Sequence, residues 1–138
     1  MIVTRRLRLE TQGEGQIIDL TDTVAGETAR SGMRHGLTTV FVTGTTAGVA
    51  VMEHEPGLAL DWAAAMERLV PRAMPYEHNE RNNDDNGHSH TRAMLLGPSL
   101  TVPVEGGALT LGRWQRIVLL DYDSRPRVRE VVLQCMGE

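Results

Sequence analysis

The sequence predicts an α+β fold, a mixed or antiparallel β-sandwich with two or three helices packed on it. Three observations predict this class. About eight short segments have the alternation or β-branched composition that is typical of strands. Two or three helical stretches interrupt them, so that strand–strand hairpins and strand–helix–strand units both occur. With 41% hydrophobic residues and no linker or repeat, the chain is expected to form one domain over residues 1–138.

The first strands and the first helix are predicted in the N-terminal quarter. Residues 1–11 alternate apolar and polar side chains, which predicts a half-exposed strand. Residues 15–20 predict a second strand, and the glycines before them permit a turn. Residues 21–32 are expected to be helical, with Thr21 as the side-chain cap of the first turn and Gly32 as the stop.

A buried strand pair and a second helix are predicted next. Residues 36–44 are rich in β-branched side chains, which indicates a central strand, and residues 47–55 are expected to pair with it. A helix is predicted from Pro56 to the breaker Pro71. Its apolar side chains recur at spacings of three and four: Leu58, Trp62, Ala65, Met66 and Leu69.

The last third of the chain is predicted to be mostly β-structure. Residues 91–97 favour a short helix that Gly97 closes. The remaining segments are expected to be strands joined by short turns: 99–104, 108–112, 114–123 and 128–137.

Composition excludes several classes of function. The net charge of −4 and the 4% aromatic content argue against a nucleic-acid partner, which needs a basic face with aromatic stacking platforms. All 14 basic residues are Arg, so neither a Schiff-base lysine nor a phosphate-loop lysine can operate. We find no signal-like or membrane-spanning apolar run and expect a cytoplasmic protein without a membrane partner. Cys135 is expected to be an inert buried thiol.

The stretch "NNDDNGHSHTR", residues 82–92, is the most polar part of the chain. His88 and His90 form an H-x-H pair, and on an extended segment both rings would point the same way. Imidazole and carboxylate ligands suit zinc or a similar divalent ion, and further candidates lie nearby in sequence: His78, Asp84 and Asp85. A solvated surface loop explains the same residues, so both interpretations stay open.

Two other groups of polar residues are candidates. Thr45 and Thr46 stand at a strand break where hydroxyls and amides can bind phosphate, and Glu53 at a strand end suits a general base or a metal ligand. An ordinary polar loop is the alternative. A third group alternates on one face of a strand and suits an anion, a salt-bridged surface or a subunit contact: Arg125, Arg127 and Arg129.

Three segments together resemble the YjbQ family: "TGTTAGVAVMEHE", "NGHSHTRAMLLGPSLTVPVEGGALTLGRWQRIVLLDYD" and "VVLQCMGE". The likeness runs from the first strand to the terminal Gly137 and Glu138. Its most specific parts are "HSH-x-RAMLLGPSLTVPV" and "LGRWQRI". This family is a set of small proteins whose members are often described as secondary thiamine-phosphate synthases.

The resemblance implies a homotrimer with a polar pocket for a divalent metal, zinc or magnesium, and for a small phosphorylated metabolite. The implied reaction joins a pyrimidine diphosphate to a thiazole phosphate and releases diphosphate. Carried onto this chain, the metal ligands are His78, His88 and His90. The catalytic residues are Glu53, Arg127 and Arg129, and the residues that bind substrate or phosphate are Thr45, Thr46, Trp114 and Gln115.

The chain departs from the family pattern at one important point. Family members typically read "HTTA" where this chain has Gly44 to Ala47, and "NEN" where it has Met52, Glu53 and His54. His54 would replace the missing imidazole only if the fold brought it to the same pocket. Three functions follow: a weak thiamine-phosphate synthase, a non-catalytic trimeric binding or accessory protein with a degenerated pocket, and a metal-dependent hydrolase.

Overall fold

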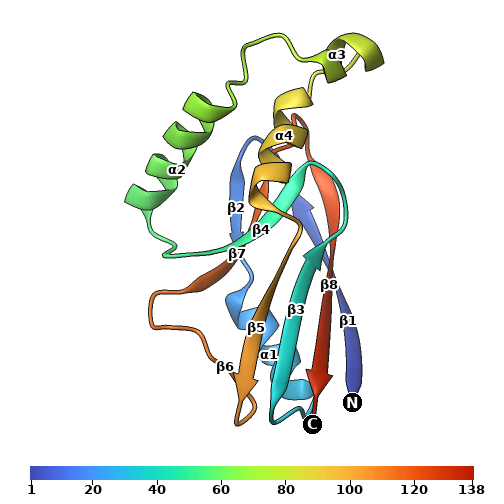
Figure 1. The fold of residues 1–138 in the computed structure, drawn as a ribbon, viewed down its shortest axis with the longest axis vertical. Helices are drawn as coiled ribbons and strands as arrows, with labels where there is room; N and C mark the ends of the chain where they lie inside the picture. The colour runs from blue at the N-terminus through green and yellow to red at the C-terminus, as the bar shows by residue number, and fades with distance from the viewer.

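The computed structural model describes residues 1–138 as eight strands and four helices (Figure 1). In chain order they are β1 (Ile2–Thr11), β2 (Gln16–Asp19), α1 (Thr21–Arg30), β3 (Gly36–Val42), β4 (Ala47–Met52), α2 (Pro56–Leu69), α3 (Glu77–Asn82), α4 (Gly87–Leu96), β5 (Ser99–Glu105), β6 (Ala108–Leu109), β7 (Arg116–Asp121) and β8 (Arg127–Gly137).

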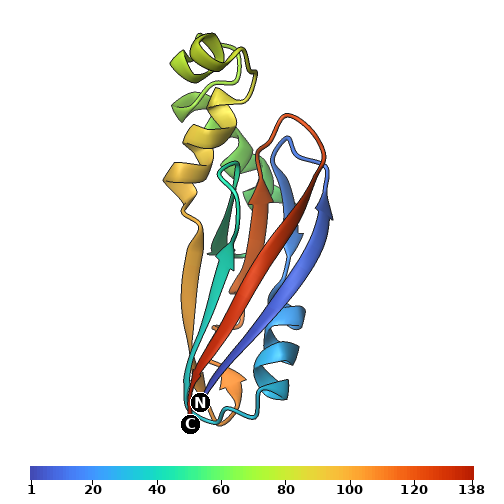
Figure 2. The ribbon, with the colours of Figure 1, turned by 90° about the vertical axis from the view of Figure 1, so that its right-hand side faces the viewer.

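The strands form two sheets, and every pairing is antiparallel. The larger sheet has the order β1-β8-β3-β5-β6 and the smaller one β2-β7-β4. Apolar side chains of both sheets and of α1 fill the space between them: Leu20, Val24, Val40, Val42, Ala47, Val49, Val102, Ile117, Leu119, Val131 and Leu133. The predicted α+β fold is confirmed. Figure 2 looks onto the outer face of the larger sheet, which no helix covers.

One predicted strand pairing is wrong. β4 does not pair with β3: it pairs with β7 in the smaller sheet, whereas β3 lies between β8 and β5 in the larger one. The chain crosses from one sheet to the other over the four residues Thr43–Thr46. Two consecutive apolar strands with a short glycine-containing link have the same pattern whether they form a hairpin or an arch, so the sequence pattern did not separate these two arrangements.

The predicted cap of α1 is also wrong. The N-cap position is Leu20, and no side chain caps the helix. The Thr21 hydroxyl instead accepts a hydrogen bond from the Ile117 amide at 2.8 Å, while Asp19 Oδ1 accepts one from the Thr21 amide at 2.9 Å. The side chain of Thr21 therefore fastens α1 to β7, because a buried strand amide competes for the same hydroxyl.

The second helix is confirmed, and one helix lies outside the predicted segments. In α2, both carboxylate oxygens of Glu55 accept hydrogen bonds from the first amides of the helix, and Met66 is its only buried residue. The short helix α3 has no apolar periodicity, so no pattern predicted it. The helix predicted for residues 91–97 begins earlier, at Gly87, and thereby includes both histidines of the H-x-H pair.

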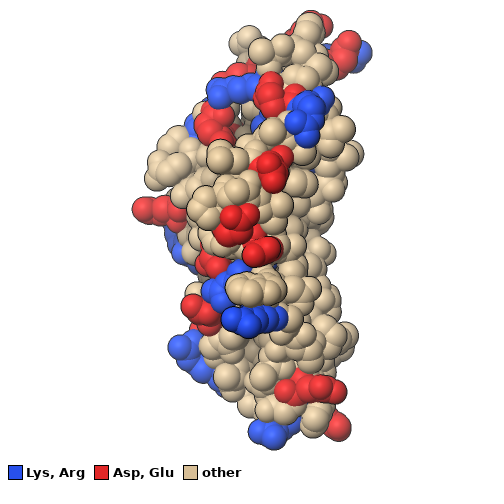
Figure 3. Space-filling model, turned by 90° about the vertical axis from the view of Figure 1, so that its left-hand side faces the viewer, with Lys and Arg blue, Asp and Glu red and all other residues tan.

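The surface over α2 carries charges of both signs. Figure 3 shows basic and acidic side chains interspersed on this side of the molecule, without a continuous basic area. None of the four helices combines the length and the apolar character that crossing a membrane requires.

Candidate functional site

A polar cavity of about 500 Å³ lies where the β3–β4 crossing meets the beginning of β8 and the N-terminus of α4. We call it the Thr45 pocket. It is lined by the crossing Thr43–Thr46, by Asp84, Asn86 and His90, and by Asp123 and Arg127–Arg129. Five of the site residues predicted from the sequence meet here: Thr45, Thr46, His90, Arg127 and Arg129.

A buried ion pair lies behind this pocket. Arg129 donates from Nε to Asp121 Oδ2 at 2.6 Å and from Nη2 to Asp121 Oδ1 at 3.0 Å. The Thr11 hydroxyl donates to the same carboxylate at 2.6 Å, and Arg129 Nη2 also donates to Thr46 Oγ1 at 2.6 Å. Burial alone would raise the pKa of Asp121, but the hydrogen bonds from Arg129 and Thr11 hold that pKa below its ordinary value.

A second carboxylate, Asp123, connects three residues that line the pocket. It accepts hydrogen bonds from Arg127 Nε at 2.6 Å, from the Thr46 hydroxyl at 3.1 Å and from Asn86 Nδ2 at 3.4 Å. The amide of Ser124 donates to it at 2.7 Å. Burial disfavours its charge, yet these donors lower the pKa of Asp123 to about 2. Asp123 is therefore a charged, fixed anchor at neutral pH.

The pocket keeps several hydrogen-bond donors without a partner. The backbone amides of Gly44, Thr45 and Thr46 donate to no group of the chain. Arg127 uses only its Nε for Asp123, so both terminal nitrogens are free, and its side chain is 43% exposed. Consecutive free amides beside a guanidinium are suited to phosphoryl oxygens.

The charges that line the pocket balance one another. Arg127 and Arg129 face Asp84 and Asp123, and the buried Asp121 neutralises Arg129 further. There is no excess of positive charge that would attract an anion from a distance. Recognition of an anion here would depend on directed hydrogen bonds.

The H-x-H pair is not extended, and its two rings diverge. On α4 the side chains of residues i and i+2 are roughly 200° apart around the helix axis. His88 is 2% exposed, beside Tyr76 and Ser89, and burial together with Arg92 and Arg72 lowers its pKa. His90 lies in the pocket instead, with Nδ1 at 3.1 Å from the Thr45 carbonyl. The premise that the pair lies on an extended segment is wrong, because both histidines lie on α4, and a shared ion stays a prediction.

The remaining metal-ligand candidates form an incomplete set. The rings of His78 and His90 are 4.4 Å apart between centroids, and His78 Nε2 lies 3.5 Å from Asp84 Oδ2. His78 Nε2 is also 3.0 Å from Asn86 Oδ1, which already gives it a hydrogen-bond partner. No group of three His, Cys, Asp or Glu side chains is arranged to hold a metal ion. In a single chain the predicted metal site is therefore incomplete, and the metal stays a prediction.

Other predicted site residues lie in a separate cavity of about 300 Å³, which we call the Glu53 pocket. Glu53, His54 and Trp114 line it together with Arg113 and Arg116. His54 is thus not brought to Gly44, which lines the Thr45 pocket, and it does not replace the missing imidazole. The guanidinium of Arg113 stacks on the Trp114 ring, 4.6 Å from its centroid.

Two further predicted residues have local structural contacts. Gln115 Oε1 accepts a hydrogen bond from the Gly112 amide at 2.7 Å and so closes its own turn. Arg125 does not line the Thr45 pocket and pairs with Asp84 and Asp85 at its rim. Of the three alternating arginines, only Arg127 and Arg129 reach the pocket.

The sequence reasoning missed the residues that organise the pocket. Asp121, Asp123 and Asn86 are each at most 4% exposed and fix Arg127, Arg129 and Thr46. The "DYD" triplet at the end of a strand was the available signal. Its two carboxylates stand at i and i+2, as Arg127 and Arg129 do, and this matched spacing indicates two ion pairs.

Comparison with known proteins gives a consistent result. A family model described as "UPF0047 protein YjbQ-like" matches residues 5–138. A UPF0047 protein of Archaeoglobus fulgidus is 42% identical over 130 residues, which cover 94% of this chain and 98% of that protein. A second one, from Methanothermobacter thermautotrophicus, is 37% identical over 137 residues, covering 99% and 94% of the two chains.

Solved structures show the same architecture. A YbjQ-like protein of unknown function from Sulfolobus solfataricus P2 superposes with a TM-score of 0.89 at 28% identity over the whole of both chains. A hypothetical protein from Aeropyrum pernix K1 gives a TM-score of 0.85 at 36% identity, covering 97% of this chain and 99% of the other. These names describe proteins whose function is not assigned.

Proposed function

This chain belongs to the UPF0047 YjbQ-like family, and we propose that it binds a small phosphorylated metabolite in the Thr45 pocket. One observation carries the proposal. Gly44, Thr45 and Thr46, whose backbone amides have no partner in the chain, line the same cavity as Arg127, whose terminal nitrogens are free. Each such donor gains when a phosphoryl oxygen accepts from it, because charge-assisted hydrogen bonds are stronger than neutral ones.

The balanced charge of the pocket limits the class of ligand. A strongly anionic ligand would also meet the carboxylates of Asp84 and Asp123. A phosphate ester on a neutral or cationic body satisfies both sets of groups, because its phosphate accepts from the amides while its body lies against the carboxylates. We therefore propose binding of the phosphate ester, without a chemical reaction, as the function of the pocket in a single chain.

We extend this proposal to weak thiamine-phosphate synthase activity, which the resemblance to the YjbQ family implies. In such a reaction Arg127 would neutralise charge on the leaving diphosphate. Glu53, the implied base, lines the other cavity, so a single chain brings together the binding groups without the base. An assay with the pyrimidine diphosphate and the thiazole phosphate tests this activity. The alternative, a non-catalytic binding or accessory protein, predicts binding without product.

Replacement of Arg127 tests the binding proposal. We expect Arg127→Gln to weaken the binding of phosphoethanolamine, a phosphate ester on a cationic body, about tenfold or more, because a hydrogen bond to a charged group contributes about 1.5–3 kcal/mol. Titration calorimetry measures this affinity, and thermal denaturation checks that the variant is folded. Arg113→Gln is the matched control, since Arg113 lines the Glu53 pocket. If Arg113→Gln lost the affinity and Arg127→Gln kept it, the anion site would be the Glu53 pocket.

A metal-dependent reaction in the same pocket, such as the metal-dependent hydrolase, is the second candidate. It is favoured by the close approach of the His78 and His90 rings, with Asp84 beside them. We expect any zinc retained by the purified protein to fall on His78→Ala or His90→Ala and to persist in His88→Ala, because His88 is buried elsewhere. Elemental analysis measures the zinc. Equal loss in all three variants, or no stoichiometric zinc in the wild type, would remove this candidate.

The implied trimer has a suitable surface on the larger sheet. Strand register aligns four outward apolar side chains in one row across the sheet: Ile2, Met136, Leu37 and Pro103. Phe41 lies on the same face, 42% exposed. We propose that copies of the chain associate through this face and expect Phe41→Arg to shift the mass to that of a monomer. Gel filtration with light scattering measures this. A wild-type monomer would contradict the trimer.

A further inference from the structure

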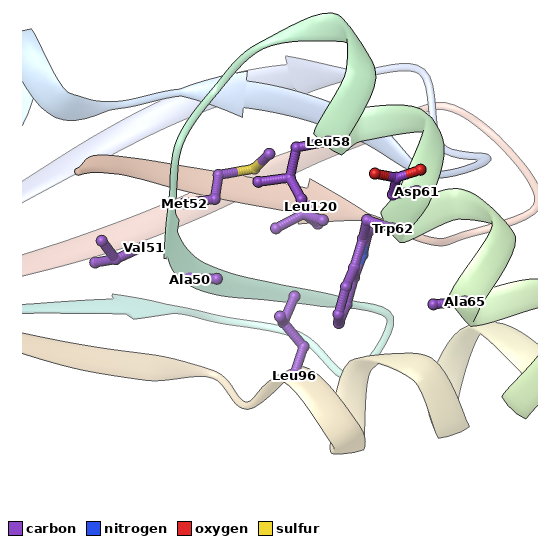
Figure 4. A pocket seen from close by; sticks show the side chains of 9 residues that line it. All are labelled: Ala50, Val51, Met52, Leu58, Asp61, Trp62, Ala65, Leu96 and Leu120. Atoms are coloured by element: carbon purple, nitrogen blue, oxygen red, sulfur yellow. The ribbon is translucent and has the colours of Figure 1, made fainter. Parts of the chain in front are cut away.

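An apolar groove lies between α2 and β4, apart from both polar pockets. Its volume is about 260 Å³, and eight of its nine lining residues are hydrophobic (Figure 4). One wall is the strand segment Ala50–Met52, and the other is the helix face with Leu58, Trp62 and Ala65. None of these residues takes part in the contacts of the Thr45 pocket.

The groove exists because α2 touches the smaller sheet at few points. Met66 is the only buried side chain of the helix, and the wall residues Ala50 and Ala65 are too small to fill the space between strand and helix. The atoms around such a space lack van der Waals partners on one side. An apolar ligand would provide those contacts.

The walls of the groove are held in place. Trp62 Nε1 donates a hydrogen bond to the Tyr122 hydroxyl, so the indole is fixed in the wall of the groove (Figure 4). The groove offers no polar group to a phosphate apart from a carboxylate. Asp61 is the one charged lining residue, it is exposed, and it forms neither an ion pair nor a side-chain hydrogen bond within the chain.

We propose that this groove binds a small aromatic molecule that carries a cationic group. The ring occupies the space beside Trp62, Ala50 and Ala65, and the cation pairs with Asp61. The volume agrees with this class, because a dry apolar cavity of about 150 Å³ already holds benzene. The unpaired carboxylate at the rim selects the charge, since a cationic ligand gains an ion pair there and an anionic one is repelled.

Fluorescence of Trp62 tests the proposal. In a Trp114→Phe background Trp62 is the only indole, and benzylamine, benzyl alcohol and benzoate are three ligands of similar size and different charge. We expect saturable binding in the order benzylamine, benzyl alcohol, benzoate. Asp61→Asn should weaken benzylamine about twofold to fivefold, the effect of an exposed ion pair, and leave benzyl alcohol unchanged. Benzoate binding as tightly as benzylamine, or no saturable binding of any of the three, would overturn the proposal.

A cavity-filling variant separates this groove from other sites. Ala65→Leu adds volume from the helix side and should abolish binding of all three ligands while the melting temperature is kept or raised. Leu60→Ala, on the exposed side of the same helix, should change neither. If Ala65→Leu left the affinity unchanged, or if it altered the mass by light scattering, the groove would not be a ligand site, and the second result would assign it to contact with another copy.

Discussion

Asp121→Ala is expected to destabilise the fold by about 3–5 kcal/mol, the usual cost of removing one partner of a buried ion pair. The Arg129 side chain is only 7% exposed and the Asp121 side chain is fully buried. Removal of the carboxylate leaves the Arg129 guanidinium without its charged partner, and it leaves the Thr11 hydroxyl only the Arg127 carbonyl, at 3.3 Å. Urea denaturation followed by circular dichroism measures the loss. Such a loss is a large share of the stability of the domain, since domains are stable by only about 5–15 kcal/mol.

Two further variants show whether the loss of stability arises from the unpaired charge of Arg129. Asp22→Ala removes a carboxylate that also pairs with an arginine but is 92% exposed, and it should change the free energy of unfolding by less than about 0.5 kcal/mol. The double variant Asp121→Leu/Arg129→Met replaces the pair with apolar side chains and should recover much of the stability. If Asp121→Ala cost no more than Asp22→Ala, the ion pair would not hold the fold together.

This ion pair also explains why the Thr45 pocket has a fixed shape. Thr11 is on β1, Asp121 on β7 and Arg129 on β8, and Arg129 reaches Thr46 in the crossing between the two sheets. The pair therefore joins both sheets at the end where the pocket opens. The stability of the protein and the geometry of the Thr45 pocket depend on the same buried charges. Asp121→Ala is therefore also expected to disturb ligand binding.

The sequence predicted those helices and strands whose apolar spacing depends only on the element itself. Residues 1–11 and the helix from Pro56 were predicted close to their observed bounds, because alternation and helical spacing are local signals. The pairing of β4 was not predictable in this way, since it depends on which sheet the chain enters after Thr46. Helix α3 has six polar residues and therefore no periodic signal.

The candidate site was predictable in part for the same reason. The alternation predicted one face for Arg125, Arg127 and Arg129. Arg127 and Arg129 lie on β8 and line one pocket, whereas Arg125 precedes the strand and does not line it. His88 and His90 were also predicted to point the same way, as residues i and i+2 of an extended segment do. They lie on a helix, where this spacing separates the side chains. Glu53 stands at the far end of β4 from Thr46, so one strand length divides residues that the sequence analysis had grouped together.

Gly44 decides whether this pocket can acquire the histidine that the family resemblance places there. We expect Gly44→His to destabilise the fold and to displace Arg129, without creating a metal ligand. The backbone at Gly44 has φ +112°, a conformation that side-chain-bearing residues rarely adopt, and a Cβ there would lie 2.8 Å from Arg129 Nη1. Such strain costs about 1–3 kcal/mol before the contact with Arg129 is counted. Urea denaturation and zinc analysis of the variant measure both effects.

A matched pair of alanine variants separates the destabilisation due to backbone strain from that due to the contact with Arg129. Gly32 also has a positive φ, +78°, but a Cβ there would meet nothing within 4 Å, so Gly32→Ala reports backbone strain alone. Gly44→Ala should cost more, by the amount needed to move the guanidinium away from Thr46 and Asp121. If Gly44→His were as stable as the wild type and bound zinc, the crossing would be free to adopt another conformation. The pocket would then need only one substitution to complete the metal site that the resemblance implies.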